Sequence, residues 1–116
     1  MISQHYRFHG HGSLRYVSKN AQPVRSKWCT IKAVPNHKRS HTRIAVVVSR
    51  KVHKRAVVRN RIRRRIYEIL REELPRIATV HDIVVIVTSL EVWTAPHDEL
   101  RQTLLGQLNS AGVYKK

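Results

Sequence analysis

The chain has 116 residues, which is enough for one domain with a modest core and too few for two. Its formal net charge of +16 indicates a polyanionic partner, either a nucleic acid or an anionic membrane. No apolar run is long enough to span a bilayer, and the first residues lack the apolar core of a secretory signal. The single cysteine excludes an internal disulfide and a cysteine zinc cluster. These features predict a cytoplasmic protein. A membrane partner is disfavoured, because residues 55–74, the most basic helical stretch, contain no Trp or Phe to lie at a membrane boundary.

The charge is unevenly distributed along the chain. Residues 1–67 contain eighteen Lys or Arg and no Asp or Glu, whereas all seven acids lie from Glu68 onward. Within this basic part, residues 50–65 hold nine Lys or Arg in sixteen positions. A charge run is usually a solvated helix face, but such faces mix both signs, and here no acids relieve the repulsion. The pattern therefore favours a surface that binds nucleic acid.

The first part of the chain predicts a loose segment followed by a short helix. Residues 1–12 are polar and contain two glycines and several histidines. Ser13 is a suitable N-cap for a helix over 13–20, with Leu14 and Val17 on its buried side. A proline three residues later breaks this helix.

Residues 28–34 alternate in hydropathy and predict a half-buried strand. One face is apolar, and the other carries Trp28, Thr30 and Lys32. Trp28 has two interpretations, namely partial burial at a sheet edge or an aromatic surface beside Lys32 on which an unpaired base stacks. We favour the second, because the face is otherwise polar.

The next segments connect two predicted strands to the basic run. Residues 35–42 form a basic loop that either contacts phosphate or is simply solvated. Residues 43–49 form an apolar strand, which suggests burial on both faces. A turn over 50–55 then leads into the central helix.

The central helix is predicted to run from Arg55 or Ala56 to Leu74, where Pro75 stops it. Apolar residues at helical spacing form a narrow stripe that packs on a core, and arginines surround this stripe. The stripe comprises Val58, Ile62, Ile66 and Ile69. Guanidinium groups repeated along a rigid element suit the repeating phosphates of a nucleic acid.

The last third predicts a strand and a helix. Residues 82–88 are rich in β-branched residues and predict a buried strand. In the loop over 90–95, we expect Trp93 to be a packing anchor rather than a platform for a ligand. Thr94 is a candidate N-cap for the last helix, which has a proline in its first turn and ends at Gly112. The buried stripe of this helix comprises Leu100, Leu104 and Leu108.

The predicted order of elements is helix, two or three strands, helix, strand and helix. It fits an α+β domain, a two-layer α/β sandwich with one four-stranded sheet. No protein active site is evident, because residues 1–67 lack the carboxylates of a metal site and the chain lacks known catalytic motifs. His53 could act as a base, but no acid lies near it in the sequence to orient it. The chain is predicted to bind rather than to catalyse.

Residues 48–68, VSRKVHKRAVVRNRIRRRIYE, resemble the signature of the bacterial ribonuclease P protein subunit, in which a strand leads into a basic Arg-Asn-Arg helix. The flanking stretches 43–49 and 81–87 are similar to the strands on either side of that helix. The resemblance implies that residues 1–116 form a single domain with a mixed four-stranded sheet and the order α-β-β-β-α-β-α. It also implies a left-handed β-α-β crossover, as in the second domain of a small-subunit ribosomal protein. The sequence pattern does not show handedness, and the general rule favours the right-handed form.

The same resemblance implies a reaction and its partners. In that family's holoenzyme, the ribonuclease P RNA removes the 5′ leader of precursor tRNA by magnesium-dependent hydrolysis. The protein binds this RNA and holds the leader in a cleft between the sheet and the first helix. The protein itself then has no catalytic residue, no bound metal or cofactor and no small-molecule substrate.

The family motif assigns site residues to positions of this chain. The predicted RNA-binding residues are Arg50, Lys51, Lys54, Arg55, Arg59, Asn60, Arg61, Arg63 and Arg64. The candidates for the leader cleft are Tyr16, Trp28, Thr30 and Lys32. Asn60 could bind RNA, bind a metal-bound water or cap local backbone. Leu14 and Ser18 stand where the family's first helix presents aromatic residues to the leader.

Three other classes of protein compete with this interpretation. A ribosomal or general RNA-binding protein would bind ribosomal RNA and be indifferent to tRNA leaders. A DNA-compacting protein would prefer duplex DNA. A standalone nuclease is disfavoured, because the basic part of the chain lacks carboxylates.

Overall fold

The computed structural model describes residue 17 and residues 21–36, 41–77 and 80–114. The strands are β1 (Val24–Arg25), β2 (Cys29–Pro35), β3 (Arg43–Val48) and β4 (His81–Val87). The α-helices are α2 (Ala56–Glu73) and α3 (His97–Ser110). Two 3₁₀-helices, η2 (Leu74–Arg76) and η3 (Leu90–Trp93), follow α2 and β4. Of the predicted first helix, only Val17 is described, and it is helical and buried.

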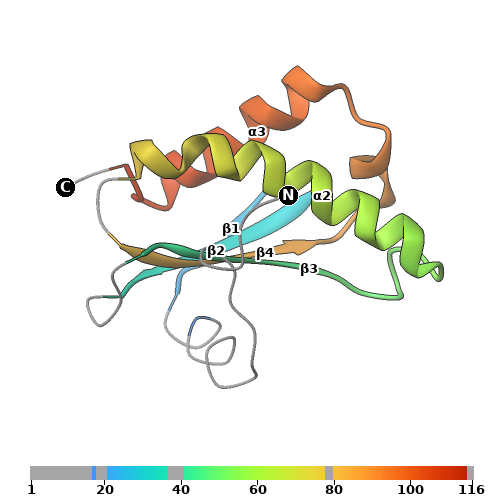
Figure 1. Ribbon diagram of the computed structural model, residues 1–116, viewed down its shortest axis with the longest axis horizontal. Coiled ribbons are helices and arrows are strands. Elements are labelled where there is room, and N and C mark those ends of the chain that lie inside the picture. The colour runs from blue at the N-terminus through green and yellow to red at the C-terminus, as the bar shows by residue number, and fades with distance from the viewer. Residues whose placement is uncertain (1–16, 18–20, 37–40, 78–79, 115–116) are drawn as a thin grey trace.

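The four strands form one mixed sheet in the order β1-β2-β4-β3. β2 runs antiparallel to β1 and β4, whereas β3 runs parallel to β4 and is connected to it through α2. Both α2 and α3 lie on the same side of this sheet (Figure 1). The predicted α+β sandwich with a mixed sheet is confirmed, and the hand of the crossover stays a prediction.

The main core lies between the sheet and the two helices. Alternate residues of β2, β3 and β4 point into it, as the period of two along a strand requires. The predicted stripe of α2 packs against them, and Val58, Ile62, Ile66 and Ile69 are all buried. The predicted stripe of α3 is buried as well, since Leu100, Leu104 and Leu108 have no exposed surface.

A smaller cluster covers the opposite face of the sheet. Val34, Ala45 and Val84 belong to the alternate set of strand residues, and Val17 is buried against them. β4 is therefore enclosed on both faces, which explains its nearly continuous apolar sequence.

Polar side chains add hydrogen bonds at one end of the sheet and along its β3 edge. Asp82 accepts hydrogen bonds from Arg43 Nε at 2.9 Å and Nη2 at 2.8 Å, and from Asn36 Nδ2 at 2.7 Å. β3 is an edge strand, and the hydroxyl of Tyr67 on α2 accepts the backbone N–H of Val46 at 3.2 Å. This bond satisfies a donor that would otherwise lack a partner beneath the helix.

Two predictions for the last third are wrong. Thr94 does not cap the last helix, because residues 90–93 form η3 and the Thr94 N–H donates to the Glu91 carbonyl. α3 begins at His97, after Pro96, without a side-chain cap. Trp93 is not the packing anchor of this segment, since it is 36 % exposed and Val92 is the buried residue.

Candidate nucleic-acid interface

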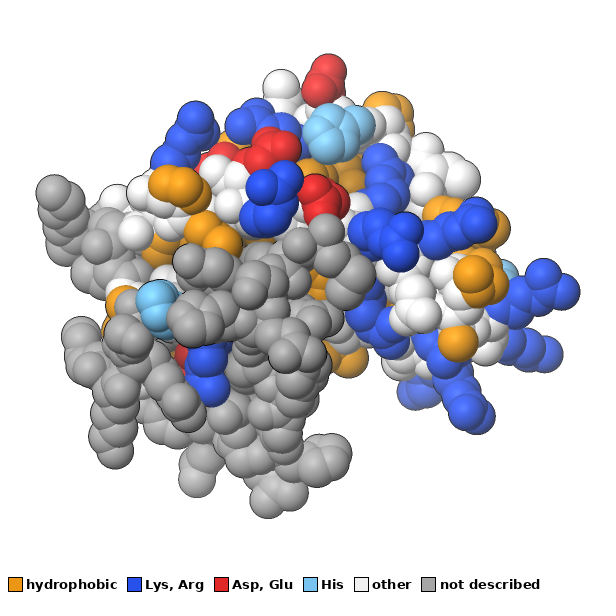
Figure 2. All heavy atoms as spheres, viewed as in Figure 1, with side chains coloured by type: hydrophobic (Ala, Val, Ile, Leu, Met, Phe, Trp, Pro, Cys, Tyr) orange, Lys and Arg blue, Asp and Glu red, His pale blue; other side chains and the backbone are white. Residues whose placement is uncertain are grey.

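The basic segment lies at the surface around the start of α2. Figure 2 shows Lys and Arg side chains gathered at this end of the molecule. Seven of the nine predicted RNA-binding residues are exposed, whereas Arg59 and Arg63 are half-buried. The exposed ones are Arg50, Lys51, Lys54, Arg55, Asn60, Arg61 and Arg64.

The N-terminus of α2 adds to this positive surface. Its N-cap is Arg55, which makes no side-chain capping bond, and its first turn contains no acid. The first N–H groups of a helix have no partner within the helix and carry partial positive charge. An anion near this terminus would meet both those N–H groups and the neighbouring cations.

The cations of this surface are not neutralised by described carboxylates. The ion pairs among the described residues lie elsewhere and join Lys27 to Glu99, Arg43 to Asp82, Arg71 to Glu68, Arg76 to Glu73, and Arg101 to Glu73. None of them involves a predicted RNA-binding residue. The acids of α2 occupy its second half, so the first half keeps its positive charge for a partner.

Arg59, one of the predicted RNA-binding residues, makes hydrogen bonds within the chain. Its Nη1 donates to the carbonyls of His53 at 3.0 Å and Lys54 at 2.7 Å. The guanidinium therefore holds the turn between β3 and α2 in place. Arg59 is half-buried, and by holding this turn it fixes the backbone that carries the exposed Lys54 and Arg55.

Asn60 and Arg63 bind each other on the surface of α2. Arg63 Nη1 donates to Asn60 Oδ1. Of the three alternatives for Asn60, none included this contact between side chains. This hydrogen bond orients the guanidinium of Arg63, which lies one helical turn after Asn60.

Arg65 has a structural role that the sequence did not indicate. Its Nη1 donates to the carbonyls of Val92 at 2.5 Å and Trp93 at 3.0 Å, and its Nη2 donates to that of Ala95 at 2.6 Å. These acceptors lie about thirty positions further along the chain, so no local pattern could have revealed them. One side chain thus fastens η3 and the start of the last loop to α2.

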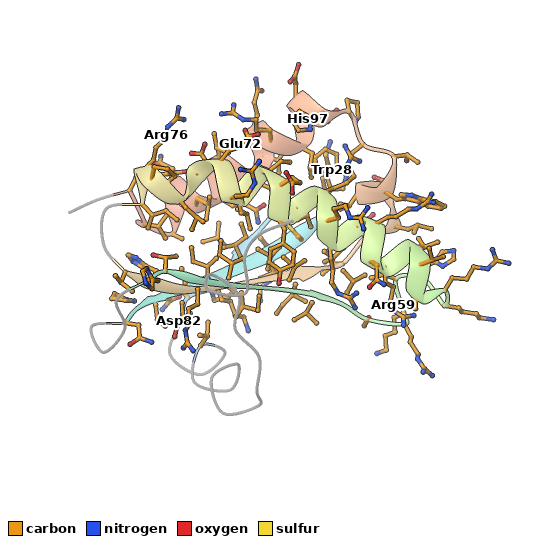
Figure 3. All side chains as sticks on the ribbon, in the orientation of Figure 1. Trp28, Arg59, Glu72, Arg76, Asp82 and His97 are labelled. Atoms are coloured by element: carbon orange, nitrogen blue, oxygen red, sulfur yellow. The ribbon has the colours of Figure 1, made fainter. Side chains whose placement is uncertain are left out.

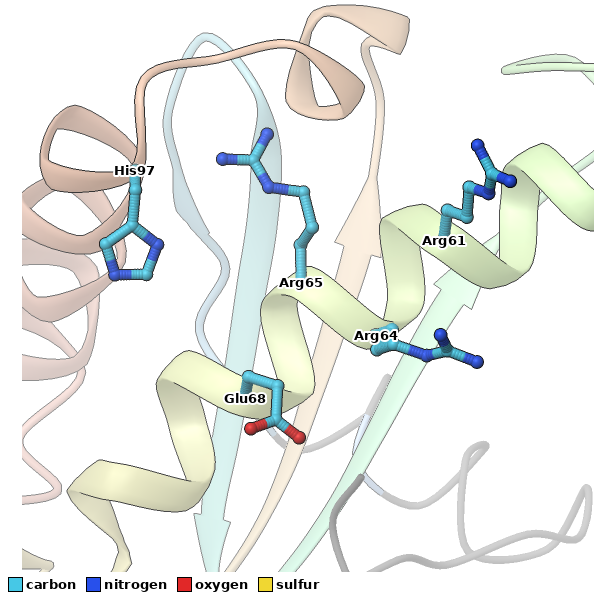
Figure 4. Close-up of a pocket in the computed structure, with 5 residues that line it drawn as sticks. All are labelled: Arg61, Arg64, Arg65, Glu68 and His97. Carbon is cyan, nitrogen blue, oxygen red and sulfur yellow. The ribbon is translucent and has the colours of Figure 1, made fainter.

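A hollow of about 560 Å³ lies between α2 and the start of α3 (Figure 4). Its lining residues are Arg61, Arg64, Arg65, Glu68 and His97. In Figure 4, Arg61 and Arg64 extend from α2 on the side away from His97, whereas Glu68 lies nearer the middle. Three guanidinium groups line this hollow beside one carboxylate, so its lining carries a net positive charge that suits an anion.

The prediction for Trp28 is wrong. Trp28 is 3 % exposed and belongs to the main core on the helix side of the sheet. β2 begins only at Cys29, so the alternation of the strand does not apply to the residue before it. Lys27 covers the ring, with its Nζ 4.4 Å from the ring centroid. Trp28 offers no surface on which a base could stack.

Thr30 and Lys32 occupy the predicted face. They alternate with the core residues of β2 and lie half-buried on the face that carries the smaller cluster with Val17. Figure 3 shows that Trp28 lies on the helix side of the sheet, away from this face. Tyr16, Leu14 and Ser18 lie outside the described residues.

His53, the candidate base of the basic segment, has a backbone partner. His53 Nδ1 accepts the backbone N–H of Arg55 at 3.0 Å, so this nitrogen is used in the turn. The described part of the chain contains no group of three His, Cys, Asp or Glu side chains that could hold a metal ion. Among the helices it describes, none is long and apolar enough to cross a membrane.

Comparison with known proteins gives one consistent result. The family model described as "Ribonuclease P" matches residues 2–112. The ribonuclease P protein component of Chloroflexus aurantiacus is 34% identical over 106 residues, which cover 91% of this chain and 77% of the relative. That of Lactobacillus delbrueckii subsp. bulgaricus is 32% identical over 115 residues, covering 96% of this chain and 91% of the relative.

Solved structures show the same fold. The RNase P protein of Staphylococcus aureus superposes with a TM-score of 0.82 at 24% identity, covering 95% of this chain and 98% of that one. The RNase P protein of Thermotoga maritima gives a TM-score of 0.76 at 24% identity, covering 88% of this chain and 94% of that one.

Proposed function

Because the chain belongs to the ribonuclease P protein family, we propose that it binds the catalytic RNA of ribonuclease P and the 5′ leader of precursor tRNA. Membership makes the chain the protein part of a tRNA-processing ribonuclease complex that also contains RNA. The proposal adds a division of labour, in which the RNA hydrolyses the phosphodiester and the protein binds and positions.

The observation that carries this proposal is the uncompensated charge on the first half of α2. Arg61 and Arg64 are exposed, and neither pairs with a described carboxylate. Neutralising RNA phosphates releases counterions, which supplies binding free energy. It also lowers the repulsion between two RNA molecules that must approach each other.

Magnesium belongs to the RNA in this proposal. This assignment is supported by the described residues, among which no group of three His, Cys, Asp or Glu side chains could hold a metal ion. The protein instead replaces part of the charge screening that magnesium supplies. The holoenzyme should therefore work at magnesium concentrations too low for the RNA alone.

The leader is assigned to the sheet face opposite α2 and α3. Thr30 and Lys32 lie on this face, and both are half-buried rather than enclosed. The hydroxyl of Thr30 can donate to a phosphate or a base, and the ammonium of Lys32 can pair with a phosphate. A single strand running over β2 would meet both.

A reconstitution assay tests the proposal. Precursor tRNA is incubated at low magnesium with ribonuclease P RNA alone, with the protein alone, and with both. We expect cleavage at the mature 5′ end only with both, because the protein supplies charge and the RNA supplies the reaction. Failure of the protein to stimulate cleavage, together with binding to ribosomal RNA, would favour the general RNA-binding alternative.

Leader binding has its own test. Lys32→Ala should raise KM for a substrate with a long leader by about fivefold, the equivalent of roughly 1 kcal/mol for a solvent-accessible ionic contact. Its affinity for ribonuclease P RNA should not change. Lys27→Ala is the matched control, because Lys27 is an exposed lysine in the same part of the chain that pairs with Glu99. An equal effect in both variants would argue against the assigned face.

A further inference from the structure

A pair of aromatic rings, one half-buried and one exposed, lies beside the start of α2. The rings of His53 and Trp93 are 6.0 Å apart between centroids and meet edge to face at 68°. Trp93 is 36 % exposed, whereas the second tryptophan of the chain, Trp28, is buried in the core. Trp93 therefore keeps part of its aromatic surface accessible at this place.

Both rings are carried by backbone that arginines of α2 hold in place. Arg65 binds the carbonyls of Val92, Trp93 and Ala95 with two nitrogens. Arg59 binds the carbonyls of His53 and Lys54. Since the side chains start from fixed backbone, little conformational entropy is lost when a ligand stacks on them.

The surroundings favour an anionic ligand with an aromatic part. His53 is followed directly by the exposed cations Lys54 and Arg55. Figure 2 shows hydrophobic side chains lying singly among the Lys and Arg side chains at this end. A protein partner would require a continuous apolar patch, whereas RNA offers bases and phosphates side by side.

We propose that Trp93, supported by His53, is a platform on which an unpaired base of the ribonuclease P RNA stacks. This inference rests on the proposed function. η3, which carries Trp93, packs against α2, whereas the residues assigned to the leader lie on the opposite face of the sheet. The base therefore comes from the catalytic RNA and not from the leader. Phosphates on either side of it reach Lys54 and Arg55.

The experiment compares Trp93→Ala, Trp93→Phe and the control Leu90→Ala in the full-length protein. Leu90 is an exposed aliphatic residue of the same short helix. Affinity for ribonuclease P RNA is measured at several salt concentrations. Trp93→Ala should weaken binding by about 5- to 150-fold, the range of one base–aromatic stack. Trp93→Phe should keep most of the affinity, and Leu90→Ala should bind like the wild type.

The salt dependence separates this platform from the cationic surface. Trp93→Ala should leave the slope of log K against log salt unchanged, because no phosphate contact is lost. If Trp93→Ala binds like the wild type while Arg61→Ala and Arg64→Ala bind weakly, the proposed role of Trp93 is wrong and the proposed function stands. If none of these variants changes binding, the proposed function fails as well.

Fluorescence gives a second measurement that does not depend on the alanine variant folding. Stacking of a base should quench Trp93, and the buried Trp28 should not respond. Quenching on addition of ribonuclease P RNA should therefore disappear in Trp93→Phe. Quenching that persists in Trp93→Phe would overturn the platform. Quenching by precursor tRNA alone would assign the base to the leader and contradict the proposed partner.

Discussion

At the scale of single residues, buried polar groups define the geometry of the sheet. Asp82 is 3% exposed at its side chain and accepts three hydrogen bonds, two from Arg43 and one from Asn36. Gln107 of α3 donates to the carbonyls of Val24 and Cys29, at 2.8 and 3.1 Å, and accepts the Cys29 thiol. These bonds fix β1, β2, β3 and β4 relative to their neighbours with little apolar area involved.

Replacing Asp82 with alanine should lower the free energy of unfolding by about 3 kcal/mol, because it removes a buried carboxylate that binds the half-buried guanidinium of Arg43. Urea unfolding of the purified protein measures this loss. Glu99→Ala is the control, since it removes an exposed ion pair whose side chains are 60% and 49% exposed. That pair should contribute less than about 1 kcal/mol. Similar losses in both variants would contradict the prediction.

Stability should fall above about pH 9 because of Cys29. Burial raises the pKa of its thiol above the ordinary value of 9.0, and hydrogen bonds with Ser26 and Gln107 only partly oppose this rise. Above that ordinary value, the unfolded chain loses a proton that the folded chain keeps, so the free energy of unfolding decreases with pH. The contribution is fully present below pH 9 and is lost as pH rises towards the raised pKa.

The measurement is chemical unfolding between pH 7 and 10 for the wild type and Cys29→Ala. The wild type should lose stability in the upper part of this range, with a slope of at most about 1.4 kcal/mol per pH unit from this group. Cys29→Ala should show a smaller slope, whatever its stability at neutral pH. Identical slopes would assign the alkaline loss to other groups.

At the scale of elements, α2 combines three tasks on different sides. Its apolar stripe packs on the sheet, Arg59 and Arg65 hold the segments before and after it, and Arg61 and Arg64 extend to solvent. Arginine suits the second task because its planar group can bind several carbonyls at once. Residues of one type in one helix therefore differ in function according to the side on which they lie.

Arg65→Lys should loosen η3 although it keeps the charge, since an ammonium cannot span the three carbonyls that the guanidinium binds. Hydrogen exchange should become faster at the amides of Val92 and Thr94, which close the turns of η3. The stability loss should be about 1–3 kcal/mol. Arg64→Lys, one position away and exposed, should show neither change. Unchanged exchange in Arg65→Lys would mean that η3 holds its shape without this contact.

Much of this arrangement could be predicted from the sequence. The buried stripe of α2 and the faces of β2 follow from periods of 3.6 and 2, and the end of α2 follows from Pro75; these signals depend only on neighbouring residues. The prediction for Trp28 was wrong because this residue precedes β2, and the alternation of side chains along β2 does not extend to it. The prediction for Trp93 was wrong and the role of Arg65 was missed, because contacts between η3 and α2, about thirty residues apart, set the environment of both. Local patterns contain no information about such contacts.

At the scale of the whole molecule, the basic residues are separated from the acidic ones, both along the chain and in space. Residues 1–67 contain no acid, and the described ion pairs lie away from the start of α2. A long-range field of this kind speeds the encounter with a polyanion, whereas the contacts themselves depend on where each cation lies. Variants of equal net charge can separate the two effects.

Arg61→Ala and Arg64→Ala should each weaken binding to ribonuclease P RNA and reduce the magnitude of the salt slope by about one unit, if each contacts one phosphate. Arg71→Ala removes the same charge from the same helix, but Arg71 pairs with Glu68 in the second half of α2. It should keep the wild-type slope. Three equal slopes would mean that net charge alone determines binding. Melting temperatures, measured in parallel, should remain near that of the wild type.

The enclosed position of Cys29 has a practical consequence. It is the only cysteine of the sequence, and it is 1% exposed. A cysteine introduced in place of Val57, which is 55% exposed near the start of α2, would be the one site that a maleimide dye reaches in the folded protein. Energy transfer from that dye to a labelled RNA could then report assembly in real time, with the native cysteine left in place.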